Sequence, residues 1–289
     1  VGKSSLRTWT VLERASTDPR FKKHIGKMLN DMLVEVTQAV QDQATDSGKP
    51  DLTVGYTKFL TSILPQINPD ITHEAEQKLP KGDHLTAFLG YELAKHATNT
   101  TKPTEQDPET TQATYASRQL SLGVRLAELA SYDQALIHTK KAVAIYWHLA
   151  KVNPNFYVFS LISAMNYFAV RLADVNQHKD SLTIAKASVR VCRLAGRHNP
   201  VKHNALLAKS LTNLASRYAE NNRTEKAVQY ATEALNLYRS IVDTPSSPYI
   251  SDLAMCLNDT ANHLTRANQP HKALSLSLEA CDIFSRLAN

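Results

Sequence analysis

Hydrogen-bonding side chains recur in the second half of the chain, at positions that fall on one side of amphipathic helices. They are Asn166, Lys209, Asn213, Asn258 and Asn262. An amide side chain both donates and accepts hydrogen bonds, so a row of asparagines can hold the backbone of an extended polypeptide in either orientation. These residues therefore predict recognition of a peptide. The alternative is that they are solvated, or cap contacts between neighbouring helices.

A second set of candidate binding residues is basic. Lys186, Arg190, Arg193 and Arg197 recur at steps of four, three and four, which places them in one stripe along a helix. The plainer interpretation is a solvated outer face; the sharper one is an acidic partner, or the chain's own segment 51–111, which holds 5 Lys/Arg against 9 Asp/Glu. Phosphates could also pair with such a stripe. Aromatic residues are sparse on the helix sides expected to form a binding groove, and no RNA-reading pattern is visible, so the sequence argues against nucleic acid.

Residue patterns typical of catalysis or metal binding are missing from the sequence. The 11 histidines are scattered, without an HExxH motif or a paired His/Cys ligand spacing. Gly2-Lys3-Ser4 matches the end of a phosphate-binding loop, but the upstream glycine and strand that such a loop needs do not precede it. We therefore expect no enzymatic activity, no metal and no cofactor.

A period of 46 residues organises the helices that carry these side chains. Ala215, Ala227 and Ala234 are separated by 12 and 7 residues, and steps of 46 from each of them reach only Ala, Gly or Ser. The equivalent positions are Gly123, Ala135 and Ala142; Ala169, Ser181 and Ser188; Ala261, Ala273 and Ala280. Small residues let two helices approach closely. A fixed small-residue pattern with a period of this size predicts a stacked, all-α solenoid of antiparallel helix pairs.

Composition shifts divide the chain into three expected parts. They are a helical N-terminal region (1–98), a polar, proline-bearing linker (99–110) and an array of repeats (111–289). Four repeats are expected at 112–154, 155–200, 201–245 and 246–289. In addition, Ala75, Ala87 and Ala94 reproduce the spacings of 12 and 7, which fits a degenerate repeat at 70–98.

Two phrases of the array resemble a known family. They are SLTNLASRYAENNRTEKAVQYATEALNLYRSI (210–241) and AMCLNDTANHLTRANQPHKALSLSLEACDIFSRLA (254–288). Both resemble the tetratricopeptide repeat, in the long-helix class of kinesin light chains and of fungal and bacterial STAND signalling proteins. The period departs from the usual length of about 34 by 12 added residues, which longer helices accommodate. The resemblance implies a right-handed superhelix in which the first helix of each repeat lines a concave groove.

The same resemblance implies a non-catalytic scaffold that binds a peptide or partner helix in that groove. Lys209, one turn before Asn213, resembles part of a carboxylate clamp, although Met255 occupies the position equivalent to Lys209. One alternative is the scaffold or sensor portion of a larger STAND-type ATPase. Another is an oligomerisation module, because the last helix (273–287) ends without a polar capping helix and would leave apolar surface uncovered for self-association. The residues expected to be uncovered are Leu276, Ile283 and Leu287.

Several features bear on location. The chain starts without an initiating Met or a secretory apolar core, which suggests a fragment or a processed product. Cys192, Cys256 and Cys281 fall on apolar helix sides, so we expect small core hydrophobes and a reducing, cytoplasmic setting. No apolar run approaches the length of about 20 residues that a membrane span needs, so no membrane partner is expected.

Overall fold

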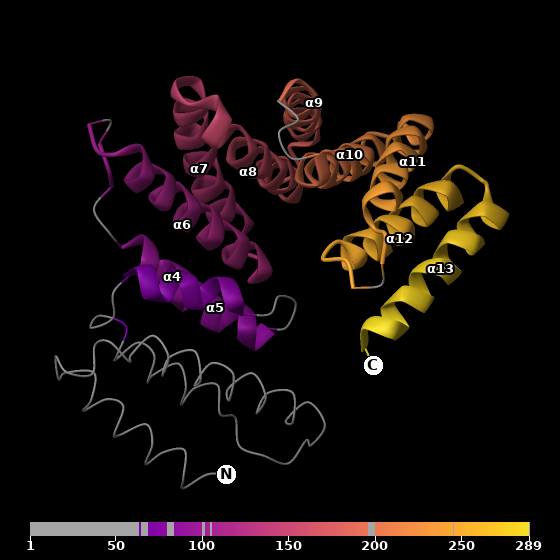
Figure 1. The fold of residues 1–289 in the computed structure, drawn as a ribbon, viewed down its shortest axis with the longest axis horizontal. Helices are drawn as coiled ribbons and strands as arrows, with labels where there is room; N and C mark the ends of the chain where they lie inside the picture. Colours follow the sequence, from indigo (N-terminus) through magenta and orange to yellow (C-terminus); the bar gives the residue numbers. More distant parts are fainter. Residues whose placement is uncertain are drawn as a thin grey trace, which may run out of the picture. The chain divides into compact units, whose positions relative to one another are not determined.

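The structure, a computed structural model, describes residues 64, 69–79, 84–99, 102–104, 106–195, 200–244 and 246–288. All regular secondary structure in these residues is helical (Figure 1). The chain divides into two compact units, Val1–Ala142 and Val143–Asn289, and the division falls inside α7. The helices are α4 (Pro69–Lys78), α5 (His84–Thr98), α6 (Glu109–Glu128), α7 (Tyr132–Val152), α8 (Pro154–Asp174), α9 (His178–Leu194), α10 (Pro200–Glu220), α11 (Thr224–Ile241), α12 (Ile250–Arg266) and α13 (Pro270–Ala288).

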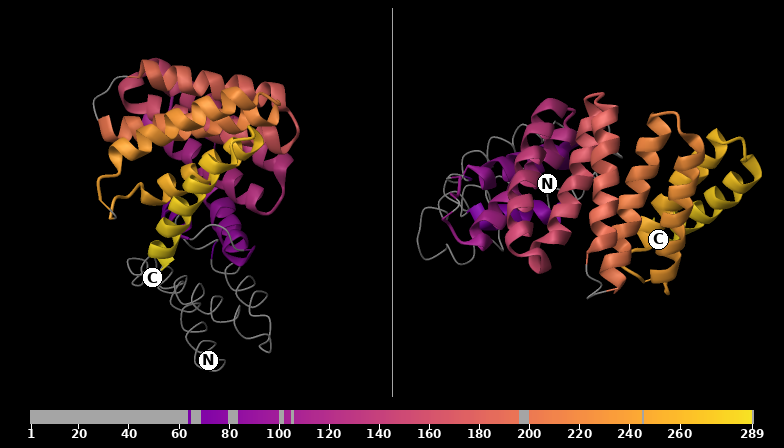
Figure 2. Two further views of the ribbon diagram at one scale, coloured as in Figure 1. Left: turned by 90° about the vertical axis from the view of Figure 1, so that its right-hand side faces the viewer. Right: turned by 90° about the horizontal axis from the view of Figure 1, so that it is seen from above.

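The second unit is a succession of helix pairs. Helices α8 and α9, α10 and α11, and α12 and α13 pack as pairs, and each pair packs on the next (Figure 2). The first helices of the pairs also touch one another, α8 with α10 and α10 with α12. The all-α fold of antiparallel helix pairs predicted from the 46-residue period is confirmed.

The small residues of the period lie where the helices meet. Ala215, Ala227 and Ala234 are fully buried, and the hydroxyl of Ser181 on α9 donates to the carbonyl oxygen of Ala169 on α8 at 2.6 Å. In the first unit a Cβ on Gly123 would lie 2.5 Å from a Thr139 side-chain oxygen. A larger side chain at these positions would push the paired helices apart.

A left-handed residue ends the first helix of each of the four full repeats. Ala130, Asn176, Asn222 and Asn268, each 46 residues after the last, have φ between 56° and 61°. The next residue donates its backbone N–H five residues back, as Arg223 does to the Tyr218 carbonyl at 2.9 Å. This is the Schellman arrangement, and asparagine tolerates its left-handed backbone better than most residues. The turn reverses the chain and makes each pair antiparallel.

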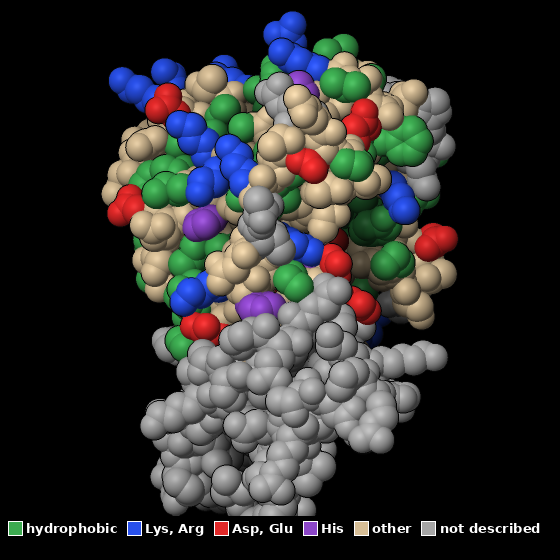
Figure 3. All heavy atoms as spheres, turned by 90° about the vertical axis from the view of Figure 1, so that its left-hand side faces the viewer, with side chains coloured by type: hydrophobic (Ala, Val, Ile, Leu, Met, Phe, Trp, Pro, Cys, Tyr) green, Lys and Arg blue, Asp and Glu red, His purple; other side chains and the backbone are tan. Residues whose placement is uncertain are grey.

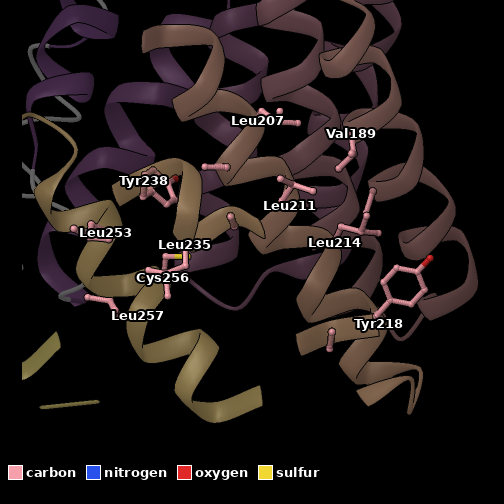
Figure 4. Close-up of a cluster of buried hydrophobic side chains, with 14 of the residues drawn as sticks. Val189, Leu207, Leu211, Leu214, Tyr218, Leu235, Tyr238, Leu253, Cys256 and Leu257 are labelled. Atoms are coloured by element: carbon pink, nitrogen blue, oxygen red, sulfur yellow. The ribbon is translucent and has the colours of Figure 1, made fainter. Parts of the chain in front are cut away.

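One apolar core runs through the second unit. Figure 4 shows the leucines of α10 pointing into it, with Tyr238 from α11 and Leu257 from α12 in the same cluster. Leu211 and Leu257 are fully buried, and Tyr238 is 3% exposed. Because first and second helices alternate along the cluster, each repeat depends on its neighbours for burial of its apolar face. The core thus fixes the polar positions on the opposite side of α8, α10 and α12.

The first unit contains a buried charge network. Arg125 on α6 is fully buried and donates to the Glu76 carboxylate at 2.7 Å and to the carbonyls of Glu76 and Leu79. A Cβ on Gly90 would lie 2.5 Å from Arg125 Nε, so α5 needs glycine there. Helices α4 and α5 occupy the expected degenerate repeat at 70–98. The boundaries of the N-terminal region and of the linker at 99–110 stay predictions, since most of residues 1–68 lies outside the described part.

One helix departs from the expectation about membranes. Helix α8 is long and apolar enough, by length and composition, to cross a membrane. It packs against α9 and α10, and a core helix meets the same criteria, so this is weak evidence for a span.

Candidate functional site: a groove lined by α8, α10 and α12

A groove of about 300 Å³ lies along the first helices of three successive repeats. This volume is at the lower end of ligand pockets, which suits one or two side chains of a partner. The lining residues are Asn166, Tyr167 and Val170 of α8; Lys209, Thr212, Asn213, Ser216 and Arg217 of α10; Tyr238 of α11; and Asp252, Met255, Cys256 and Asp259 of α12. We call this site the α8–α10–α12 groove.

Helical spacing explains which side chains face the groove. On α10, Lys209 and Asn213 are four residues apart, and on α12, Asp252, Met255 and Asp259 follow at steps of three and four. Such steps place side chains on one face of a helix. The opposite faces of the same helices carry the apolar core, so the polar residues are directed to the groove.

Lys209 forms the cationic wall. Its side chain is exposed, and its ammonium lies 5.5 Å from the centroid of the Tyr167 ring on α8. A cation over an aromatic face at this distance is held weakly, by about 0.5–1 kcal/mol at an exposed site. Lys209 therefore leans towards α8, and its ammonium makes no ion pair with a described residue. Its role in binding stays a prediction.

Acidic residues of α12 form a second wall of the groove. Asp252 and Asp259 are half-buried on either side of Met255, which is 51% exposed. Burial raises the pKa of the Asp259 carboxyl above its ordinary value. Neither carboxylate makes an ion pair or side-chain hydrogen bond with a described residue, so both can accept hydrogen bonds from a ligand. The sequence interpretation missed these two residues.

Arg217 is a further groove residue that the sequence interpretation missed. It is 7% exposed, its Nε and Nη1 have no hydrogen-bond partner among the described residues, and one nitrogen pairs with Glu220 at 2.7 Å. Burial lowers the pKa of its guanidinium. The same pair recurs 46 residues earlier as Arg171 with Asp174 at 2.9 Å. Arginine followed by an acid three residues later, repeated at the period, was the available sequence signal.

The prediction that Asn166 lies on an exposed surface is wrong. Asn166 is 4% exposed; its Nδ2 donates to Ser210 at 2.8 Å and its Oδ1 accepts from Ser188 at 2.7 Å. Asn213 is half-buried and donates from Nδ2 to the Asn166 carbonyl at 2.9 Å. Helix α10 covers Asn166, because small residues let α8 and α10 approach closely. These two asparagines tie neighbouring repeats together, and the Oδ1 of Asn213 remains for a ligand.

The last two predicted asparagines lie elsewhere on α12. Asn258 and Asn262 are exposed, and neither lines the groove. Asn258 lies two periods after Asn166. In the earlier repeat, α10 covers this position on α8. The structure thus places Asn166, Lys209 and Asn213 together along the groove. Asn258 and Asn262 lie outside the groove. Their role in binding stays a prediction.

The basic stripe lies on α9. Lys186, Arg190 and Arg193 are exposed along this helix, and Arg193 pairs with Glu233 of α11 at 2.7 Å. Arg197 lies outside the described residues. Figure 3 views the molecule from the left-hand side of Figure 1, and basic, acidic and apolar side chains are mixed on that face. None of the α9 residues lines the α8–α10–α12 groove, so the structure separates the two candidate sites.

Two expectations for the last helix need correction. Ile283 is only 5% exposed, whereas Leu274 and Leu278 are about 60% exposed and extend the uncovered apolar stripe towards the start of α13. Cys281 is exposed rather than a core residue, while Cys192 and Cys256 are buried as expected. No group of three His, Cys, Asp or Glu side chains suited to a metal occurs among the described residues.

Comparison with known proteins decides the family of the central repeat. The family model described as Tetratricopeptide repeat matches residues 207–249, which comprise most of α10 and all of α11. This stretch is a tetratricopeptide repeat. The groove residues Lys209, Asn213 and Arg217 therefore lie on the first helix of a tetratricopeptide repeat. No curated protein sequence matches the chain.

Solved structures share the fold at low sequence identity. BtubC from P. vanneervenii aligns with a TM-score of 0.56 and 12% identity, over 90% of this chain and 92% of that protein. The nearly identical TPR-like repeats of a kinesin light chain from Podosopora anserina align with a TM-score of 0.52 and 14% identity, over 76% and 98%. A STAND protein with a tetratricopeptide repeat sensor from Pyrococcus horikoshii aligns at 0.51 and 17%, over 96% of this chain and 39% of that protein. These similarities confirm the helical-repeat solenoid.

Proposed function

We propose that the protein is a non-catalytic scaffold that holds an extended segment of a partner protein in the α8–α10–α12 groove. The observation that carries this proposal is the pair of oppositely charged walls, Lys209 on α10 and Asp252 and Asp259 on α12, around an exposed Met255. A partner backbone supplies donors and acceptors, and its side chains supply charge and apolar surface. The groove presents a counterpart for each.

Each wall has a defined part in binding. Asn213 Oδ1 would accept a backbone N–H of the partner, and Lys209 would donate to a carbonyl or carboxylate. Asp259 is partly desolvated without a cation beside it. A lysine or arginine of the partner would therefore form a charge-assisted hydrogen bond there, worth about 1.5–3 kcal/mol, or about tenfold or more in affinity.

Peptides selected from a random linear library against the full chain test the proposal. We expect the selected peptides to lose affinity by about tenfold or more in a Lys209→Glu variant, measured by fluorescence anisotropy. The matched control is Lys140→Glu, which reverses another exposed charge, on α7. Equal affinity for the wild-type chain and both variants would contradict groove binding.

A solved structure of a complex with a similar fold supports the same proposal. The chain aligns with a Rap protein complexed with competence and sporulation factor, with a TM-score of 0.55 and 12% identity over 97% of this chain and 75% of that one. A complex of a protein with this fold supports a partner-binding role for the array. The kind of ligand proposed for this chain is inferred from its groove residues, not from that complex. The expected cytoplasmic location stays a prediction.

A second candidate is the sensor portion of a larger regulatory ATPase. The observation behind it is the alignment of 96% of this chain with 39% of a STAND protein that has a tetratricopeptide repeat sensor. Sequencing the gene upstream of Val1 tests it. A complete Gly-x4-Gly-Lys-Ser/Thr loop after a strand would support the ATPase, and a start codon directly before Val1 would refute it.

Self-association is the third proposed mode, through the apolar stripe of α13. Leu274, Leu278 and Phe284 are 42–62% exposed, which is the observation that favours it. Light scattering on the wild type and on Leu278→Glu tests the idea. A dimer that dissociates in the variant supports it, and a wild-type monomer excludes it.

A further inference from the structure

A second pocket, of about 380 Å³, lies between α9 and α11 and shares no residue with the α8–α10–α12 groove. Its polar lining is Lys186, Arg190 and Arg193 of α9, and its floor includes Tyr218 of α10 and Tyr230 of α11. The proposed function in the groove makes no use of these residues. We call this site the α9–α11 pocket.

Positive charge is concentrated at the α9–α11 pocket. Lys186 of α9 and Lys226 of α11 both place an ammonium over the ring of Tyr218, at 5.4 and 5.5 Å. Arg193 pairs with Glu233 at 2.7 Å, whereas Arg190 and the two lysines make no ion pair with a described residue. These cations give the pocket a positive potential, so it would attract an anionic ligand.

The floor of the pocket selects the kind of anion. Tyr218 and Tyr230 stack on each other, with centroids 5.3 Å apart and planes within 1°, and Tyr218 is only 6% exposed. Nucleic-acid bases need open aromatic faces for stacking. Here Tyr218 is buried, with one face on Tyr230 and two lysine ammoniums over its ring. Leu194 at the rim is 77% exposed. An apolar side chain of a protein partner would cover that leucine.

We propose that the α9–α11 pocket docks an acidic segment of a partner protein that also carries an apolar side chain. Carboxylates of the segment pair with Lys186 and Arg190, and the apolar side chain packs on Leu194. The two sites together would let the array hold one partner in the groove and an acidic one on α9 and α11.

The probe is a fluorescein-labelled peptide of alternating Glu and Leu, added to the full chain and followed by anisotropy. The pocket variant is Lys186→Glu with Arg190→Glu. The control variant, Lys140→Glu with Lys141→Glu on α7, makes the same change in net charge at exposed positions. We expect affinity to fall about tenfold or more in the pocket variant and by about twofold or less in the control. Circular dichroism verifies the helicity of both variants.

Several outcomes would overturn the proposal. Equal losses in the two variants would mean that the net charge of +6 attracts the peptide without a site. If oligothymidylate binds more tightly than the peptide and loses affinity in the pocket variant, the site binds nucleic acid instead. If the peptide does not bind at all, the acidic ligand is refuted. A Leu194→Asp variant with undiminished affinity would remove the apolar contact. Lys209→Glu should leave binding unchanged, so the result is independent of the groove.

Discussion

Replacing Asn166 with alanine separates a structural role from a binding role at the most deeply buried of the predicted site residues. The substitution removes the hydrogen bond from Asn166 Nδ2 to Ser210 and the bond from Ser188 to Oδ1, at 2.8 and 2.7 Å. The bond from Asn213 to the Asn166 carbonyl survives, because it uses the backbone. The change therefore tests the side-chain network alone.

The expected cost follows from these contacts. Two buried side-chain hydrogen bonds contribute about 1 kcal/mol each, and the space left by the amide adds a smaller cavity penalty. Ser210 keeps a partner, since its hydroxyl also donates to the Leu206 carbonyl at 2.9 Å. We expect Asn166→Ala to lower the free energy of unfolding by about 2–3 kcal/mol.

Urea unfolding followed by circular dichroism measures this value, with Asn258→Ala as the matched control. Asn258 occupies the equivalent position two periods later but is exposed, so its loss should change stability by less than about 0.5 kcal/mol. The double variant Asn166→Ala with Ser188→Ala should be less destabilising than the sum of the single variants, because the two share a bond. A loss below about 0.5 kcal/mol for Asn166→Ala, or equal losses at both asparagines, would refute the reasoning.

Three further predictions test other parts of the structure. Ala130→Gly should raise the midpoint of thermal unfolding by stabilising the protein by about 1 kcal/mol, since Ala130 has φ 57°; a fall would contradict the left-handed turn. Burial raises the pKa of Asp259 in the folded chain above the ordinary value of 3.8. Ionisation of this carboxyl therefore lowers the free energy of unfolding as the pH rises above 3.8. Asp259→Asn should therefore increase the free energy of unfolding at neutral pH and have no effect below 3.8, and equal effects in urea unfolding at both pH values would count against it. Ellman's reagent should modify the exposed Cys281 rapidly and leave the buried Cys192 and Cys256 unmodified until the protein unfolds, and burial also raises the pKa of Cys192 to about 11. Rapid modification of a second thiol would contradict this prediction.

The fold could be predicted because helix pairing depends on local spacing. Ala215, Ala227 and Ala234 mark the contact between two helices that are adjacent in sequence, so the period alone locates it. The left-handed turns also follow the period, since Asn176 and Asn222 stand one period apart in the sequence.

The site could be predicted only in part, because burial between repeats depends on how closely non-adjacent first helices approach. Asn166 and Asn258 have the same place in the period, yet α10 covers one and nothing in the described chain covers the other. The acidic wall was missed since Asp252 and Asp259 lack the period, their equivalents one repeat earlier being Leu206 and Asn213. In the proposed function, irregular residues of this kind determine binding specificity, whereas the periodic residues determine the fold.

The central claim is that a partner segment occupies the α8–α10–α12 groove, and the methyl group of Met255 reports on it directly. The chain has 4 methionines; Met255 is 51% exposed in the groove, whereas Met165 is 4% exposed in the core. A library-selected peptide is titrated into protein labelled with ¹³C-methyl methionine. We expect the Met255 resonance to shift and saturate while the other methionine resonances stay in place. Saturable binding that leaves the Met255 resonance unmoved would contradict the account.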